Sequence, residues 1–349
     1  ERELIMQTRK SIMELAQEVQ RIKDSKADYI VAANKLEMLD DGGLSTASNH
    51  WDTNKWNTGP IAHEHIGQKL QIPKPYYDKM KDTAPALLAK NVNHWLQKSD
   101  SRHMLRTVGS TARALLSDRY RPLDNDMVLE AALPVLMEHR DFEVISAEIT
   151  DRRMYLCVVS HKLTGEVKKG DVVQYGMVIS NSEVGAGSVK VEDYVYRLAC
   201  LNGAIMATAM KKYHTGVRYD TSDFAFLSSE AIDYDNKAFM LRVRDTVRNS
   251  FSEISFQKTM EKMVASTGMM IEKKLDDFIT DVTKRFDLSN GESDSLLKNL
   301  INGGDLSKWG FTNAMTAIAN DSKDYDRAID IQRIGGQLID MDRKTWASI

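Results

Sequence analysis

The clearest alternation of hydrophobic and polar positions lies in the middle of the chain. Residues 176–180 alternate as a β-strand does, and residues 188–196 alternate again. Gly185 and Gly187 lie between these runs and can supply the positive φ angles that a tight turn needs. The pattern predicts a long β-hairpin, and the small residues that follow predict a helix from about Val195 to Lys212.

The segments around this hairpin predict an antiparallel sheet. Strand candidates follow one another at residues 142–149, 152–161, 172–182 and 188–198. The loops between them are too short for the crossovers that parallel strands require. Before them, two further strands are predicted to join at Gly109-Ser110, and Asp124-Asn125-Asp126 is predicted to cap a helix.

Helical periodicity dominates the two ends of the chain. Residues 3–23 carry apolar side chains at helical spacing, and long helices are predicted beyond Thr221, one of them starting at a capping box of Ser289 and Glu292. We therefore expect an α+β fold, with an antiparallel meander sheet, flanking helices and a helical C-terminal region. The expected divisions are an N-terminal helix and loop at 1–60, an α+β core domain at 61–220 and a helical region at 221–349.

Residues 40–60 have the composition of a loop, because they are rich in Gly, Asn, Thr and Ser. Two tryptophans, Trp51 and Trp56, lie within this segment. They either anchor the loop on the protein or offer a stacking surface to a ligand.

The composition is that of a folded protein. Hydrophobic residues make up 42% of the 349 residues, and the net charge of −3 provides no bulk attraction for nucleic acid. No apolar run approaches the roughly 18 residues that cross a membrane, and we expect a cytoplasmic protein. Cys157 and Cys200 both lie in apolar runs and are expected to be buried thiols.

The motifs that usually mark an enzyme are absent from the sequence. It contains no phosphate-binding loop, no dinucleotide fingerprint and no paired-cysteine zinc motif. His63 and His65 are spaced i, i+2, which places them on different sides of a helix. Glu183, Glu192 and Asp193 are the other candidate metal ligands. We expect no catalytic residue, no resident metal and no cofactor.

Charge is distributed unevenly along the chain. Residues 122–151 contain eight acidic residues against Arg140, whereas residues 152–219 contain ten basic residues against five acidic ones. A second basic block, residues 102–121, precedes the acidic segment. Because arginine presents a fork of donors that suits phosphate, these basic blocks are the expected nucleic-acid-binding surface. The expected binding residues are Arg102, Arg106, Arg113, Arg119, Arg121, Arg152, Arg153, Lys190, Arg197, Lys211 and Lys212.

The alternative is that these cations pair with acids inside the protein. Arg119 and Arg197 are the residues for which we weigh this alternative explicitly, with the acids of 122–151 as their partners.

Four short runs carry a resemblance to a known family: SNSEVG at 180–185, RLACLNG at 197–203, LLSDRYRPLD at 115–124 and FTNAMTAIA at 311–319. They resemble a phage- and plasmid-encoded family of unknown function, the domain of unknown function nine-three-two. The resemblance extends from about Ala62 to Leu338. It implies a mobile-element setting in DNA metabolism.

The expected order of helices, meander sheet and following helix is similar to the plan of the single-strand annealing proteins Redβ, RecT and Erf. Such proteins need a basic groove and a ring or filament rather than catalytic residues. We therefore expect a homo-oligomeric phage or mobile-element protein that binds single-stranded DNA and anneals it in recombination. One alternative is a metal-dependent nuclease or other phosphoryl-processing enzyme that uses Glu183, Glu192, Asp193 or the His63–His65 turn. Another is an oligomeric scaffold or defence-related protein without a nucleic-acid role.

Overall fold

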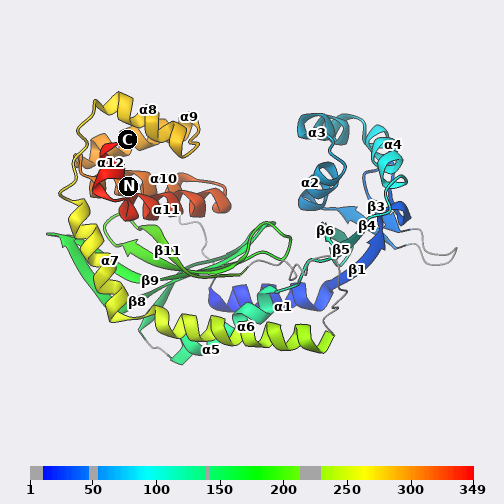
Figure 1. Ribbon diagram of the computed structural model, residues 1–349, viewed down its shortest axis with the longest axis horizontal. Helices are drawn as coiled ribbons and strands as arrows, with labels where there is room; N and C mark the ends of the chain where they lie inside the picture. Colours follow the sequence, from blue (N-terminus) through cyan, green and yellow to red (C-terminus); the bar gives the residue numbers. More distant parts are fainter. Residues whose placement is uncertain (1–10, 47–53, 139–140, 213–228) are drawn as a thin grey trace, which may run out of the picture.

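In the computed structural model the chain forms an open arch (Figure 1). The structure describes residues 11–46, 54–138, 141–212 and 229–349. One end of the arch is the N-terminal lobe, residues 26–117, and the other is a bundle of C-terminal helices. A five-stranded sheet and three helices join the two ends along the convex side.

The N-terminal lobe contains a six-stranded sheet in the order β1-β5-β6-β4-β3-β2. Its strands are β1 (Lys26–Ala32), β2 (Leu36–Met38), β3 (Leu44–Thr46), β4 (Lys55–Thr58), β5 (Arg102–Val108) and β6 (Thr111–Ser117). β1 pairs with β5, and β4 pairs with β6. Strands from both sides of residue 60, where the sequence predicts a division, therefore share one sheet. The strands of this sheet are far apart in the sequence, and no sequence periodicity indicates which of them pair.

Three helices pack against this sheet, and each carries a proline in its first turn, where a missing N–H costs nothing. They are α2 (Pro60–Lys69), α3 (Lys74–Thr83) and α4 (Pro85–Leu96). Trp56 on β4 is buried in the same apolar cluster as Leu44 and Leu105, which confirms that it anchors its segment. Trp51 lies outside the described residues. The segment expected to be a loop also provides β3 and β4.

The middle of the chain forms an antiparallel sheet in the order β11-β10-β9-β8-β7. Its strands are β7 (Phe142–Ile149), β8 (Met154–Lys168), β9 (Asp171–Asn181), β10 (Val189–Arg197) and β11 (Asn202–Lys212). The predicted hairpin is confirmed: Lys190 on β10 pairs with Ser180 on β9, and Gly185 in the turn has a φ of +76°. The sheet is an antiparallel meander, and the α+β fold is confirmed.

β11 corrects the helix expected from Val195 to Lys212. β10 continues to Arg197, and the alanine-rich run that follows forms a strand at the edge of the sheet. Helix α11 (Tyr325–Asp340) packs closely on this strand, because Gly335 and Gly336 bring its backbone against Ala204 and Ile205. The small side chains thus allow helix α11 to pack closely on β11. This packing overrides the helical propensity of the run.

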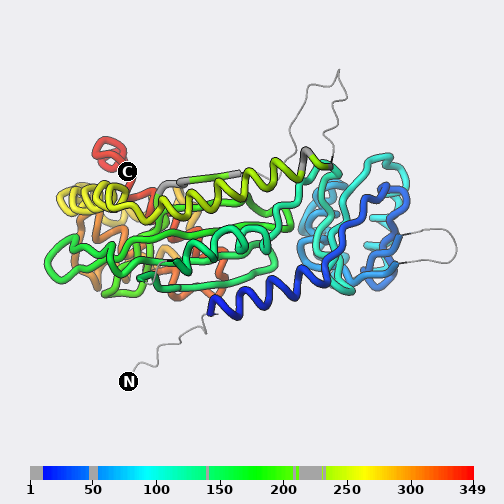
Figure 2. The backbone as a smooth tube through the Cα atoms, turned by 90° about the horizontal axis from the view of Figure 1, so that it is seen from below, coloured from blue at the N-terminus to red at the C-terminus, as the bar shows by residue number. Residues whose placement is uncertain are grey.

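Three helices lie along the convex face of the five-stranded sheet (Figures 1 and 2). They are α1 (Ile12–Ser25), α5 (Asn125–Glu138) and α6 (Ser229–Ser250). Leu15, Val128 and Val243 of these helices share one apolar core with Met177 and Ile179 of β9. The amphipathic helix predicted near the N-terminus is thus confirmed from residue 12 onward, and residues 1–10 lie outside the described part of the chain.

The C-terminal bundle follows as predicted. Its helices are α7 (Glu253–Ser266), α8 (Leu275–Arg285), α9 (Asn290–Gly303), α10 (Lys308–Asp321), α11 and α12 (Arg343–Ala347). α9 begins at the capping box of Ser289 and Glu292 and ends at Gly304, whose φ is +62°. α10 and α11 lie on the concave side of the sheet, where Ile329 packs with Tyr155 and Tyr194. The β9–β10 hairpin extends past these helices toward the N-terminal lobe (Figure 1).

Candidate nucleic-acid interface

The N-terminal lobe meets the five-stranded sheet at a buried ion-pair network, called the joint below. Arg106 on β5 is fully buried, and its Nε and Nη2 donate to the Asp28 carboxylate at 2.8 and 2.6 Å. Its Nη1 donates to Asp124 Oδ1 at 2.6 Å and to the carbonyl oxygen of Glu183 at 3.1 Å. One guanidinium therefore ties β1, the start of α5 and the β9–β10 turn together.

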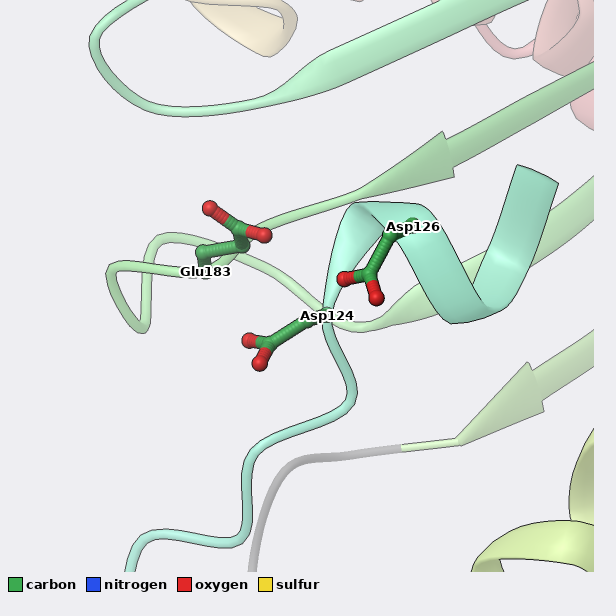
Figure 3. A group of neighbouring side chains, drawn as sticks. All are labelled: Asp124, Asp126 and Glu183. Carbon is green, nitrogen blue, oxygen red and sulfur yellow. The ribbon is translucent and has the colours of Figure 1, made fainter. Parts of the chain in front are cut away.

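Three carboxylates of the joint gather around the start of α5 (Figure 3). Asp124 precedes the helix, Asp126 lies in its first turn, and Glu183 approaches from the β9–β10 turn. Glu183 is buried and accepts a hydrogen bond from the Asn125 backbone N–H at 2.9 Å. Burial alone would raise the pKa of Asp124, but Arg106 and its neighbouring lysine hold it below its usual range.

Within the described residues, Asp124, Asp126 and Glu183 are the one set of carboxylates with metal-ligand spacing. The Lys26 ammonium lies 2.5, 3.9 and 3.8 Å from their respective oxygens and so takes the place of a cation among them. With Asp28 the joint has four carboxylates, and it has four cations: Lys23, Lys26, Arg106 and Arg113. Lys23 also pairs with the exposed Glu130 at 3.1 Å. The joint is thus a nearly charge-balanced connection between two parts of the fold.

A second group of charges lies on the concave face of the sheet. Lys190 on β10 and Lys211 on β11 are directly opposite each other across the two strands, an arrangement in which like charges repel. Arg153, just before β8, and Arg333 on α11 bring their charges to the same place, as their effect on Lys190 shows. These four residues are called the cation cluster below.

Carboxylates partly balance the cation cluster. Arg333 donates to Glu192 at 2.7 Å, and Lys190 lies 3.7 Å from the same carboxylate. Arg153 lies 3.6 Å from Asp326. Burial, together with the charges of the other three cluster members, lowers the pKa of Lys190, while Glu192 opposes this shift. Burial is the largest cause of this shift, and the neighbouring positive charges add to it.

The sheet register places Lys190 and Lys211 at one end of a row of polar side chains, and the other two members, Ser180 and Tyr155, are buried at 2% and 0% exposure. Lys190 pairs with Ser180 on β9, and Ser180 pairs with Tyr155 on β8. With Lys211, these residues lie on four neighbouring strands, so the row spans roughly 14 Å at about 4.8 Å per strand. The Tyr155 hydroxyl donates to Asp326 at 2.6 Å, which connects the row to the start of α11.

A cleft of about 670 Å³ opens near the Tyr155 end of the row, away from the Lys190–Lys211 end. It lies between the start of α2, the β7–β8 turn and the start of α11, and therefore between the N-terminal lobe and the C-terminal bundle. Its charged lining residues are Glu148, Asp151, Arg152, Lys323, Asp324 and Asp326. The cleft can thus both accept and donate hydrogen bonds.

Three of the expected binding residues are held in ion pairs inside the protein and do not contribute to a ligand-binding surface. Arg106 is held in the joint, and Arg121 is buried in an ion pair with Asp235. Arg197 binds the Asp171 carboxylate through two nitrogens, at 2.5 and 3.0 Å. These three arginines therefore pair with acids inside the protein, although the partner of Arg197 is not an acid of 122–151.

The remaining expected residues are divided between internal pairs and the surface. Arg113 pairs with Glu183 at 3.1 Å, and Arg152 pairs with Glu64 at 2.6 Å. Arg102 and Arg119 are exposed, on β5 and on the connection between β6 and α5. Arg153, Lys190 and Lys211 come together in the cation cluster. The side chain of Lys212, at the end of β11, is outside the described part of the structure.

The residues considered for metal-dependent chemistry do not converge. His63 Nδ1 shares a hydrogen bond with the Tyr77 hydroxyl at 2.9 Å, and burial lowers the pKa of His63 to about 4. Burial also lowers the pKa of His65. Glu192 is occupied by its ion pairs, and Asp193 alternates to the opposite face of β10. Glu183 is enclosed in the joint.

The sequence did not indicate several residues of the joint and the cation cluster. Lys26 and Asp28 lie on β1, a strand with no clear alternation, and Arg333 reaches the cluster only because α11 packs on β11. A strand assignment for the alanine-rich run would still have missed this pair, because two register shifts between Val191 and Tyr194 bring Lys211, rather than Ala209, opposite Lys190. Cys157 is buried as expected, whereas Cys200 is exposed in the turn before β11, which corrects that expectation.

The four runs that carry the family resemblance meet in pairs. Asn181 of the SNSEVG run donates to the Leu123 carbonyl of the LLSDRYRPLD run at 2.8 Å, next to the joint. Asn202 of the RLACLNG run donates to the Asn313 carbonyl at 3.2 Å and to the Thr316 hydroxyl at 2.6 Å, both in the FTNAMTAIA run. These runs therefore hold the sheet to α5 on one side and to α10 on the other.

A family model described as a domain of unknown function, DUF932, matches residues 113–319. The chain belongs to this family. The DUF932 match includes all four runs and begins within the joint, at Arg113. The chain matches no curated protein and no solved structure. In the part of the chain that the structure describes, no helix combines the length and apolar character needed to cross a bilayer.

Proposed function

We propose that this DUF932 protein binds single-stranded DNA across the concave face of the arch, with phosphates on the cation cluster and bases directed toward the neighbouring cleft. The observation that carries the proposal is the Lys190–Lys211 pair, which the sheet register holds face to face. Two like charges fixed side by side repel each other, and an anion bound between them relieves that repulsion.

The dimensions of the site favour a single strand over a duplex. The cleft volume of about 670 Å³ is that of a site for one small molecule, which corresponds to a nucleotide or two rather than to a double helix. The carboxylates in its lining can accept hydrogen bonds from the amino groups of unpaired bases, as acidic side chains do with cytosine. In a duplex one hydrogen of each such amino group is used in base pairing, whereas an unpaired base offers both.

The biological setting within this proposal is annealing or recombination on a phage or other mobile element, in the cytoplasm of the host. It rests on the resemblance to phage- and plasmid-encoded proteins and on the likeness in plan to Redβ, RecT and Erf. Binding and annealing need no catalytic residue, since the protein only neutralises and holds the strands.

The test is the charge-removing double variant Lys190→Met with Lys211→Met, which keeps the length of both side chains. Its affinity for a fluorescent oligothymidine is measured by anisotropy over a range of salt concentrations. We expect binding to weaken at least about tenfold, and the salt slope to fall by roughly 1.4, about 0.7 for each lost contact to a single strand. The wild type is expected to bind a duplex of the same length more weakly.

The matched control is Lys237→Met with Lys258→Met. These two exposed lysines lie on α6 and α7, so the variant carries the same change in charge away from the concave face. We expect it to bind like the wild type. Equal affinity and equal salt slope in the two double variants would overturn the assignment of the site, and a wild type that does not bind the oligonucleotide would overturn the function.

Assembly into a homo-oligomer, as a ring or a filament, is also part of this proposal. Large apolar side chains are exposed on the outer helices, among them Leu241 on α6 and Ile254 on α7, at 51% and 69%. Surfaces of this kind commonly pack against a second copy. Light scattering with and without single-stranded DNA measures the mass, and a monomer under both conditions would contradict the assembly without affecting the binding site.

A further inference from the structure

A second, smaller pocket lies inside the N-terminal lobe, apart from the concave face. It has a volume of about 140 Å³ and lies between the ends of α2 and α4 and the strands β5 and β6. Ile66, Leu96 and Leu115 form an apolar floor, and each of them is buried in the core of the lobe. A dry cavity of about 150 Å³ is large enough to hold benzene, so this pocket suits an apolar group of about four to six carbons.

The polar side chains of the pocket form a chain of hydrogen bonds. His103 Nε2 lies 2.9 Å from Ser101 Oγ, and Ser101 Oγ lies 2.7 Å from Ser99 Oγ. The Leu116 carbonyl also acts on the His103 ring as a hydrogen-bond acceptor. Ser99 is at the end of this chain farthest from the ring, and hydroxyl hydrogens rotate to suit their partners.

Lys69, an exposed residue near the end of α2, also lines this pocket. No carboxylate of the described residues lies within ion-pair distance of its ammonium. Burial lowers the pKa of Lys69, and burial and the Lys69 charge lower the pKa of His103. The open side of the pocket therefore carries a lysine and two serine hydroxyls next to an apolar floor.

We infer that this pocket binds a short aliphatic carboxylate. The carboxylate accepts hydrogen bonds from Lys69 and from the Ser99–Ser101 pair, and the alkyl chain lies on Ile66, Leu96 and Leu115. A neutral amide provides a donor where the pocket also has donors, and acetate lacks the chain that the floor would cover. Both are therefore poorer ligands than a five-carbon acid. This site is independent of the proposed DNA surface, because it shares no residue with the cation cluster or the cleft.

The experiment titrates the full-length chain with valerate, valeramide and acetate and follows binding by calorimetry. A ligand of this size with one ion pair is expected to bind with a dissociation constant of roughly 1 mM. We expect valerate to bind at one site per chain, and valeramide and acetate to bind at least about tenfold more weakly. Absence of saturable valerate binding, or equal binding of the acid and its amide, would overturn the inference.

Two variants and a control locate the site. Lys69→Met is expected to weaken valerate binding at least about tenfold, and Ser99→Ala severalfold, because each removes a donor. Lys90→Met, at an exposed position on α4, removes the same charge outside the pocket and is expected to leave binding unchanged. If Lys69→Met and Lys90→Met bind valerate equally well, the pocket is not the binding site. DNA binding is expected to be unchanged in all three variants.

Discussion

Single residues set how closely the elements of this fold can approach one another. Gly336 lies on α11 where the helix backbone faces the carbonyl of Ile205 on β11. A β-carbon at this position would overlap the backbone of the strand, which has no rotamer with which to move away. Gly291, on α9, has open space around the corresponding position.

The first prediction compares these two glycines. Gly336→Ala should lower the free energy of unfolding by about 2 kcal/mol or more, because forced overlap outweighs the gain in helix propensity. Gly291→Ala should be neutral or stabilising by up to about 1 kcal/mol, since only the propensity changes. Urea denaturation of both variants measures the difference. A Gly336→Ala variant as stable as Gly291→Ala would show that α11 does not press on β11 as described.

At the same scale, the arginines show why a charged residue type does not by itself identify a binding surface. Arg106 and Arg153 both lie in basic segments, yet Arg106 is fully buried in the joint, whereas Arg153 keeps a quarter of its side chain exposed in the cation cluster. The internal partners come from far away in sequence, as with Arg106 and Asp28, 78 positions apart.

At the scale of elements, helix ends are well specified because their signals are local. The capping box of α9 joins Ser289 and Glu292 through side-chain and backbone groups three residues apart. Glu292 also binds Arg327 of α11, at 2.6 and 2.9 Å. The Arg327 hydrogen bonds, with those from Ser289, lower the pKa of Glu292 to about 2.

The second prediction follows from this shift. A carboxylate with a lower pKa in the folded state stabilises the protein fully above its ordinary value of 4.5, and that stabilisation is lost as the pH falls toward 2. Glu292→Gln should therefore be less stable than the wild type at pH 7, by about 1 to 3 kcal/mol, and the difference should shrink between pH 5 and pH 3. Urea midpoints at several pH values measure this difference.

The control for this prediction is Glu138→Gln, which affects an ion pair with Arg248 in which both side chains are about half exposed. Exposed pairs contribute little, so its effect should be small at every pH. A difference between wild type and Glu292→Gln that stays constant down to pH 3 would mean that Glu292 does not titrate as described.

Strands were less predictable than helices. The alternation in β7 to β10 identified four strands, because each buries one or both faces in a regular pattern. β11 has the composition of a helix, and β1 to β4 are short or only partly buried. For these strands, the pairing partner and the covering helix decide the conformation.

At the scale of the whole molecule, the joint connects two sheets that have separate cores. The apolar contact between them is small and includes Val184 of the β9–β10 turn with Leu116 of β6. Arg106 lies beside this contact and holds carboxylates from both sides. Removal of this buried guanidinium leaves Asp28 without its ion-pair partner, while Asp124, which is half-buried, keeps only Lys26. The loss of one partner costs more than the pair itself contributes.

The third prediction is that Arg106→Met destabilises the protein by about 3 to 5 kcal/mol. Arg102→Met, an exposed position on the same strand, should change the stability by less than about 0.5 kcal/mol. Urea denaturation provides both values, and limited proteolysis should cleave Arg106→Met faster between the lobe and the sheet. Similar midpoints for the two variants would contradict a structural role for the joint.

The sequence alone determined the elements whose signals lie within a few residues: the capped helices, the meander from β7 to β10 and the turn at Gly185. It also identified Arg153, Lys190 and Lys211 as basic, but not that they would meet. Tertiary structure decided that the alanine-rich run is a strand, that Arg106 is internal and that Arg333, 141 positions from Glu192, joins the cation cluster. The physical reason is that helix caps and alternation act between neighbours along the chain, whereas strand pairing, burial and charge balance depend on residues that only the fold brings together.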